Sequence, residues 1–168
     1  MTQTAMCWGI DTGDGWYNII YSACRLIQFH INEKRRARAR ALKYNRLLDK
    51  ALKGNEKPLS DYYHNIYRDN AAKIMFANAI KNPKMENVPA KMHQISFTQV
   101  KEKFATLRIY TDYSDDYIDG VLDMASAASS KTCEVCGAAG KIYGQYWLYA
   151  LCSTHATDRG IKEDECAE

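Results

Sequence analysis

The stretch that decides the C-terminal part of the fold is residues 133–155, which read CEVCGAAGKIYGQYWLYALCSTH. Cys133 and Cys136 form one pair, and Cys152 and His155 form a second pair after fifteen intervening residues. Two intervening residues let both side chains of a pair reach one ion, and fifteen are enough for a short hairpin between the pairs. The pattern therefore predicts one Zn²⁺ ion bound by Cys133, Cys136, Cys152 and His155. Its role is predicted to be structural, because four protein ligands leave no open position for water.

The residues between the two pairs predict how the site is built. Gly137 and Gly140 permit a tight knuckle, Gly144-Gln145 suits a turn between two short arms, and Thr154 is expected to open a final helix. This order of knuckle, hairpin and helix is the treble-clef form of a zinc site. The alternative is a set of disulfides or idle thiols, which the lack of a secretory signal disfavours. Outside the site, we expect Cys24 to lie in the core and Cys166 to be a free thiol.

Working outward, the segment before the site predicts a hairpin and a helix. Two β-like runs over residues 94–111 are expected to pair, with their connection around Lys101-Glu102-Lys103. Ser114 is expected to cap a helix over 114–129, whose first carboxylates suit the positive end of a helix dipole. Further back, apolar residues recur at helical spacing from Trp16 to Ile31, which predicts a first helix of about four turns. Whether this helix continues past Asn32 into the next one is left open by the sequence.

The middle of the chain is strongly basic. Residues 34–103 hold 17 Lys or Arg and six Asp or Glu, whereas the final 65 residues hold five and eleven. A second helix is predicted over 33–53, ended by Gly54, and a third over 59–82, capped by Ser60. The third helix is expected to turn its apolar positions inward: Tyr63, Ile66, Tyr67, Ile74, Ala77 and Ile80. The predicted binding residues all lie on the second helix: Arg35, Arg36, Arg38, Arg40, Lys43, Arg46, Lys50 and Lys53.

Together these elements predict an α+β fold. A small antiparallel sheet packs with helices, a treble-clef or zinc-ribbon-like unit closes the C-terminal end, and the basic helices form an insertion. The expected boundaries are residues 1–32 for the first core segment, 33–92 for the insertion, 93–131 for the rest of the core, and 132–168 for the zinc unit and acidic tail.

Length and composition set the outer limits. The chain has 168 residues, of which 46% are hydrophobic and 26% charged, so we expect one domain with an insertion and a real core. The longest apolar run has seven residues, from Tyr146 to Cys152, far short of the roughly 18 that a membrane span needs. The start of the chain has neither a basic region nor an apolar stretch typical of a signal peptide. We therefore expect a cytoplasmic protein.

Several segments resemble a set of small, mostly uncharacterised phage and prophage proteins. The resemblance covers about residues 7–27 and 94–156. It is carried by Trp8-Gly9, Gly13-Asp14-Gly15-Trp16-Tyr17, Ile19-Ile20, Cys24, Val100-Lys101-Glu102-Lys103-Phe104, Leu107-Arg108, Tyr110, Thr132-Cys133-Glu134-Val135-Cys136-Gly137, Leu151-Cys152 and His155. It implies a bacteriophage origin, a zinc-stabilised fold and the cytoplasm of an infected bacterium, without naming an activity. The relatives connect the first helix to the hairpin by a shorter segment, so family function need not extend to the basic insertion.

Two binding functions are left open. Nucleic acid is the first, because basic side chains release counterions from phosphates and Tyr62, Tyr63 and Tyr67 could stack bases. A host protein or an anti-phage defence enzyme is the second, since a polarised charge steers such encounters. The basic helix could instead be a solvated face, or could self-associate through its apolar stripe to give a homodimer.

An enzyme is the least favoured reading. A treble-clef nuclease needs a catalytic His beside a second, open metal site. The candidates are His30, His64 and His93, with carboxylates at Asp112, Asp115, Asp116 and Asp119. No spacing ties them together, and capping at a helix start accounts for the carboxylates. We therefore expect a non-catalytic protein.

Overall fold

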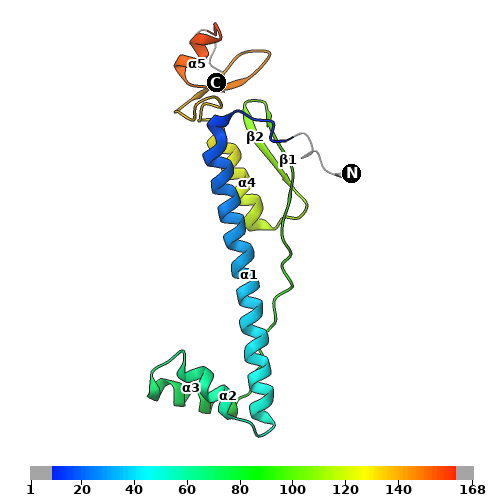
Figure 1. Ribbon diagram of the computed structural model, residues 1–168, viewed down its shortest axis with the longest axis vertical. Helices are drawn as coiled ribbons and strands as arrows, with labels where there is room; N and C mark the ends of the chain where they lie inside the picture. The colour runs from blue at the N-terminus through cyan, green and yellow to red at the C-terminus, as the bar shows by residue number, and fades with distance from the viewer. Residues whose placement is uncertain (1–8, 162–168) are drawn as a thin grey trace. The chain divides into compact units, whose positions relative to one another are not determined.

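The computed structural model describes residues 9–161 and has the predicted α+β class, with helices and two small antiparallel sheets (Figure 1). The described part of the chain divides into two compact units, one formed by residues 9–30 and 94–161 and the other by Ile31–His93. Within residues 9–161, no helix is both long and apolar enough to cross a lipid bilayer.

Helix α1 is one continuous element, Tyr17–Leu52, with 36 residues. The sequence left open whether the two predicted helices continue into each other past Asn32, and the structure shows that they do. The segment contains neither Pro nor Gly, and an internal Asn costs at most about 0.7 kcal/mol relative to Ala, which flanking helix easily offsets. Gly54 follows the helix with φ +94° and donates its N–H to the Ala51 carbonyl, so the predicted C-terminal cap is confirmed.

The core of the first unit joins the start of α1 to a hairpin and a second helix. Strands β1 (Phe97–Lys103) and β2 (Thr106–Thr111) pair antiparallel, and α4 (Asp116–Ser129) packs on β2. The buried side chains of this core come from all of these elements and include Trp16, Ala23, Val100, Leu107 and Ala125. The predicted packing of two helices on the hairpin is confirmed, but Cys24 is exposed on α1 and is not a core residue.

Two local details of this unit differ from the sequence prediction. The strands are joined at Phe104 and Ala105, both at positive φ, and not at residues 101–103. The Glu102 carboxylate accepts a hydrogen bond from the Ala105 N–H at 2.6 Å, which supports this tight turn. The cap of α4 is Asp115, whose carboxylate accepts from the Ile118 N–H, and not Ser114.

The second unit contains the end of α1, helix α2 (Lys57–His64) and helix α3 (Asp69–Lys81). The single helix predicted over 59–82 was wrong, because the chain leaves helical geometry after Asn65 and restarts at Asp69. The break lets α2 and α3 pack on each other and bury Leu59 and Ala72 with Leu48 of α1. Four side chains that were predicted to face inward are exposed as a result: Ile66, Tyr67, Ile74 and Ala77.

Residues 83–93 have no regular structure and run back beside α1 within the second unit; we call them the returning segment. The Asn45 side chain exchanges two hydrogen bonds with the backbone of Glu86, at 2.9 and 2.8 Å. Arg38 donates to the Pro89 carbonyl, and Arg35 donates to the Met92 carbonyl at 3.1 Å. Side chains of α1 therefore satisfy backbone groups of a segment that has no regular structure of its own.

Candidate metal centre

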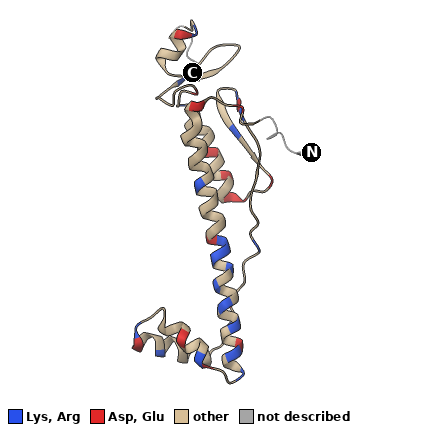
Figure 2. Ribbon diagram, in the orientation of Figure 1, with Lys and Arg blue, Asp and Glu red and all other residues tan. Residues whose placement is uncertain are grey.

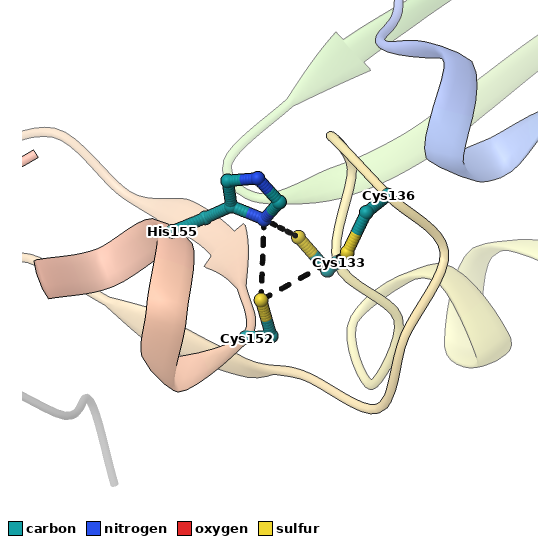
Figure 3. A group of neighbouring side chains, drawn as sticks. All are labelled: Cys133, Cys136, Cys152 and His155. Carbon is teal, nitrogen blue, oxygen red and sulfur yellow. Dashed lines mark hydrogen bonds between the residues drawn. The ribbon is translucent and has the colours of Figure 1, made fainter. Parts of the chain in front are cut away.

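The four predicted ligands come together at the C-terminal end of the first unit (Figure 3). Their ligand atoms all lie within 4.8 Å of one another. The His155 Nδ1 atom is 3.4 Å from the Cys133 sulfur and 3.2 Å from the Cys152 sulfur, and the Cys136 and Cys152 sulfurs are 3.9 Å apart. Tetrahedral Zn²⁺, with Zn–S near 2.3 Å and Zn–N near 2.05 Å, requires S···S of about 3.8 Å and S···N of about 3.6 Å. The donor set therefore fits one zinc ion.

Each pair of ligands is placed by a local backbone feature. After Cys136, Gly137 adopts φ +76° and donates its N–H to the Cys133 carbonyl at 2.8 Å, which closes the knuckle. Cys152 is the N-cap of α5 (Ser153–Asp158), and His155 lies in the first turn of that helix. Between the two ligand pairs, strands β3 (Lys141–Tyr143) and β4 (Tyr149–Leu151) form an antiparallel hairpin. The predicted order of knuckle, hairpin and helix is confirmed.

The knuckle also rests on the start of the chain, a contact that sequence reasoning missed. The Gly13 N–H donates to the Glu134 carboxylate at 2.9 Å, and the Gly15 N–H donates to the Glu134 carbonyl at 2.7 Å. The fully buried Trp16 donates its indole N–H to the Thr132 carbonyl at 2.8 Å. The Gly-Asp-Gly-Trp motif is thus a support for the metal centre.

Gly13 and Gly15 allow the backbone of the knuckle to pass very close to them. A Cβ on Gly13 would lie 2.4 Å from the Glu134 carbonyl oxygen, and one on Gly15 would lie 2.2 Å from the Cys133 carbonyl oxygen. These distances are far below any van der Waals contact, so only hydrogen fits at either position. In the sequence, the two glycines of the Gly-Asp-Gly-Trp motif indicated a close backbone approach. The neighbouring residues did not indicate which segment of backbone they approach.

The electrostatics of the cluster favour thiolates at two of the ligands. Burial raises the pKa of Cys133, but N–H groups of the knuckle and of Cys152 outweigh it and lower the pKa to about 6. The His155 N–H lowers the pKa of Cys152. The pKa of His155 is raised because its ring bonds both sulfurs, and that of Cys136 is raised because burial and the two neighbouring thiols outweigh the Ala138 N–H. A bound Zn²⁺ would supply the positive charge that holds three thiolates and a neutral imidazole together.

The predicted binding residues lie elsewhere, on the part of α1 that belongs to the second unit (Figure 2). Seven of the eight are exposed, and Arg38 is half-buried. Two of them form ion pairs on the same helix, Arg36 with Glu33 at 2.7 Å and Lys53 with Asp49 at 2.8 Å.

The histidines and carboxylates weighed for catalysis are not gathered into one site. His30 bonds the Asp115 carboxylate at 2.8 Å and stacks on the Tyr117 ring, whose centroid is 4.4 Å away. His64 bonds the Ser60 carbonyl in its own helix, and His93 is exposed. Among residues 9–161, the cysteine and histidine cluster is the group of three or more potential ligands found close together.

Comparison of the chain with protein-family models, with curated proteins and with solved structures finds no match.

Proposed function

We propose that this chain is a zinc-stabilised, non-catalytic bacteriophage protein that binds nucleic acid through the basic face of α1 in the cytoplasm of the infected bacterium. The zinc ion would hold the end of the first unit together through Cys133, Cys136, Cys152 and His155. The observation that carries the binding proposal is a row of cations on one side of α1.

Four side chains form this row, which we call the basic face: Arg40, Lys43, Arg46 and Lys50. Steps of three, three and four residues keep them on one side of a helix, and at 1.5 Å per residue they span about 15 Å. All four are exposed, and no ion pair to them is found in the described part of the chain. The opposite side of the helix is buried, with Ala41 and Leu48 in the core. The charge on the basic face is therefore free to meet phosphates.

The remaining arginines of the predicted set have structural tasks. Arg35 and Arg38 donate to carbonyls of the returning segment, so their charge persists but their side chains are held in place. Arg36 is largely neutralised by Glu33. We therefore assign the phosphate contacts to the basic face and expect smaller effects from these three.

The test is a salt titration of binding to a labelled single-stranded oligonucleotide. Replacing all four residues of the basic face by Gln should lower the slope of log affinity against log salt by about 2.8, or 0.7 per phosphate contact. Between 50 and 200 mM salt, wild type should lose about 50-fold more affinity than this variant.

The matched control removes four charges away from the basic face, by replacing Lys57, Lys73, Lys81 and Lys91 with Gln; all four are exposed. It has the same net charge as the basic-face variant and should keep most of the wild-type slope. Equal slopes in the two variants would refute the basic face as the binding surface. No binding by wild type at 50 mM salt would refute nucleic acid as the partner.

A protein partner, such as a host or anti-phage defence enzyme, is the second candidate. It is favoured by the tip of the β3–β4 hairpin, where Tyr146 is fully exposed and Trp147 is 70% exposed. Exposed Trp and Tyr are enriched among the residues that dominate protein interfaces. If this tip is the docking surface, a host protein retained by wild type should be lost by the Trp147→Ala variant, with unchanged nucleic-acid binding.

A further inference from the structure

The second unit contains a cleft of about 620 Å³ that no step above has used. It is lined by four tyrosines, Tyr44, Tyr62, Tyr63 and Tyr67, together with side chains that include Met75 and Lys84. Its size lies within the range of pockets that hold small molecules, about 300–1,000 Å³. Four tyrosines in one cleft supply flat apolar surfaces with polar edges, which suits a planar ligand that carries hydrogen-bonding groups.

The tyrosines hold one another in place through ring contacts. The Tyr62 and Tyr63 rings meet edge to face with centroids 5.6 Å apart, and Tyr44 lies 6.2 Å from Tyr62. Tyr63 is only 7% exposed and forms the floor, where its hydroxyl is 3.5 Å from that of Tyr44. Burial raises the pKa of both Tyr62 and Tyr63, so their hydroxyls stay neutral at physiological pH.

One ring of the set offers a face to a ligand. The ammonium group of Lys43 lies over the Tyr62 ring at 5.5 Å from its centroid, so that face is covered. Tyr67 is 41% exposed and lies 6.3 Å from Tyr63. Tyr67 is therefore the surface on which a planar group entering the cleft would stack.

The charges around the cleft select the kind of planar ligand. Lys84 lines the cleft, Lys43 covers Tyr62, and Arg40 acts on the pKa of the Tyr62 hydroxyl, although less strongly than Glu86 does. Glu86 is the one acidic side chain in the described lining. A cationic ligand would be repelled by this excess of positive charge, whereas a planar group attached to a phosphate would be attracted.

We propose that this cleft binds an unpaired nucleotide of single-stranded nucleic acid, with its base stacked on Tyr67 and its phosphate near Lys43 and Lys84. The proposal rests on the proposed nucleic-acid function and adds the strand state to it. Two of the cations near the cleft, Arg40 and Lys43, belong to the basic face, so a backbone following that face would bring a base to the cleft. Paired bases are stacked within their helix and cannot enter, so single strands should bind more tightly than duplex.

The experiment compares wild type with Tyr67→Ala on an oligothymidylate of about 12 nucleotides and on a duplex of the same length. Removing the ring should weaken single-strand binding about 5- to 150-fold, the usual effect of losing one base stack. Duplex binding and the salt slope should not change, because no phosphate contact is lost. Tyr67→Phe should keep the affinity, and Tyr113→Ala, which removes an exposed tyrosine of the other unit, is the matched control.

Each other outcome has a distinct meaning. If Tyr67→Ala binds single strands as wild type does, or weakens duplex binding equally, the cleft assignment is overturned while the basic face stands. If wild type binds neither probe at 50 mM salt, the proposed function fails and the cleft proposal fails with it. Thymidine monophosphate tests the other source of a nucleotide: if it binds as tightly as the oligonucleotide, the cleft is a free-nucleotide site and the strand assignment is wrong.

Discussion

The support of the zinc knuckle by the N-terminal glycines makes a sharp prediction for Gly15→Ala. The new Cβ would lie 2.2 Å from the Cys133 carbonyl oxygen, 2.5 Å from the Gly137 nitrogen and 2.6 Å from the Glu134 carbonyl oxygen. All three are backbone atoms, so no side chain can swing away. Ordinary contact begins at 3.4 Å, and the two backbones must therefore separate by about 1.2 Å.

The expected cost follows from that separation. The Gly15 N–H bond to the Glu134 carbonyl, now 2.7 Å, would be broken, which costs about 1–3 kcal/mol for a polar group left without a partner. Overpacking adds about 1–3 kcal/mol. We expect a total loss of about 2–6 kcal/mol in unfolding free energy. Because the same shift displaces the carbonyl and amide groups beside Cys133, zinc affinity should fall about 10- to 100-fold.

The assay is competition for zinc against a chromophoric chelator, with hydrogen exchange at residues 133–140 as the local readout. Gly120→Ala is the control, because a Cβ at Gly120 in α4 meets nothing within 4 Å. That change should stabilise the protein by about 0.5–1 kcal/mol and leave zinc affinity alone. A Gly15→Ala protein that behaves like Gly120→Ala, with unchanged zinc affinity and exchange, would refute the close approach.

Three further results are expected. Removing zinc with a chelator should unfold the region that begins at Cys133, because the metal supplies the folding free energy of such a site. Limited proteolysis should then cut in that region while the helices of the second unit stay protected. Full protection of the region would contradict a structural role for zinc. Zinc affinity should weaken as the pH falls from about 8 toward 6, because protons compete with zinc for the ligand atoms. The Cys133 thiolate, with a pKa of about 6, begins to take up a proton in this range, and Cys136 and His155, whose pKa values are raised, hold their protons more firmly. An affinity that is flat in chelator competition across this range would count against thiolate ligation. Ser129→Ala should lower the unfolding free energy by about 1–3 kcal/mol, measured by urea titration. The buried Ser129 hydroxyl accepts a hydrogen bond from the Leu107 N–H at 2.8 Å, and the substitution would leave that N–H without a partner. An unchanged unfolding free energy would show that water takes the place of the hydroxyl.

The zinc ligands could be predicted from the sequence because the chemistry is local. Two residues between the members of each pair let both side chains reach one ion, and the fifteen between the pairs are enough for a short hairpin. The same is true of the cap at Gly54, since a glycine after a helical run adopts positive φ without strain. These features depend on neighbours in the chain, and the structure confirms that the four residues come together and that Gly54 ends the helix.

The boundaries of the helices could not be predicted in the same way. The sequence left open whether a helix continues past Asn32, and the helix expected over 59–82 is broken after Asn65. In both places the intrinsic preferences differ by less than about 1 kcal/mol, so they do not decide the boundary. At the second break, the packing of α2 and α3 against Leu48 decides it. Periodicity alone then assigned Ile66 and Ile74 to a core from which they are excluded.

By itself, therefore, the sequence determined the metal-ligand set, the α+β class and the concentration of positive charge in the middle of the chain, because spacing, pattern and composition act over short distances. Only the tertiary structure decided that Gly13 and Gly15 support the knuckle at Glu134, that Arg35 and Arg38 bind the returning segment, and that four tyrosines line one cleft. Those contacts join residues far apart in the chain, and they form only where packing brings two backbones or two helices together.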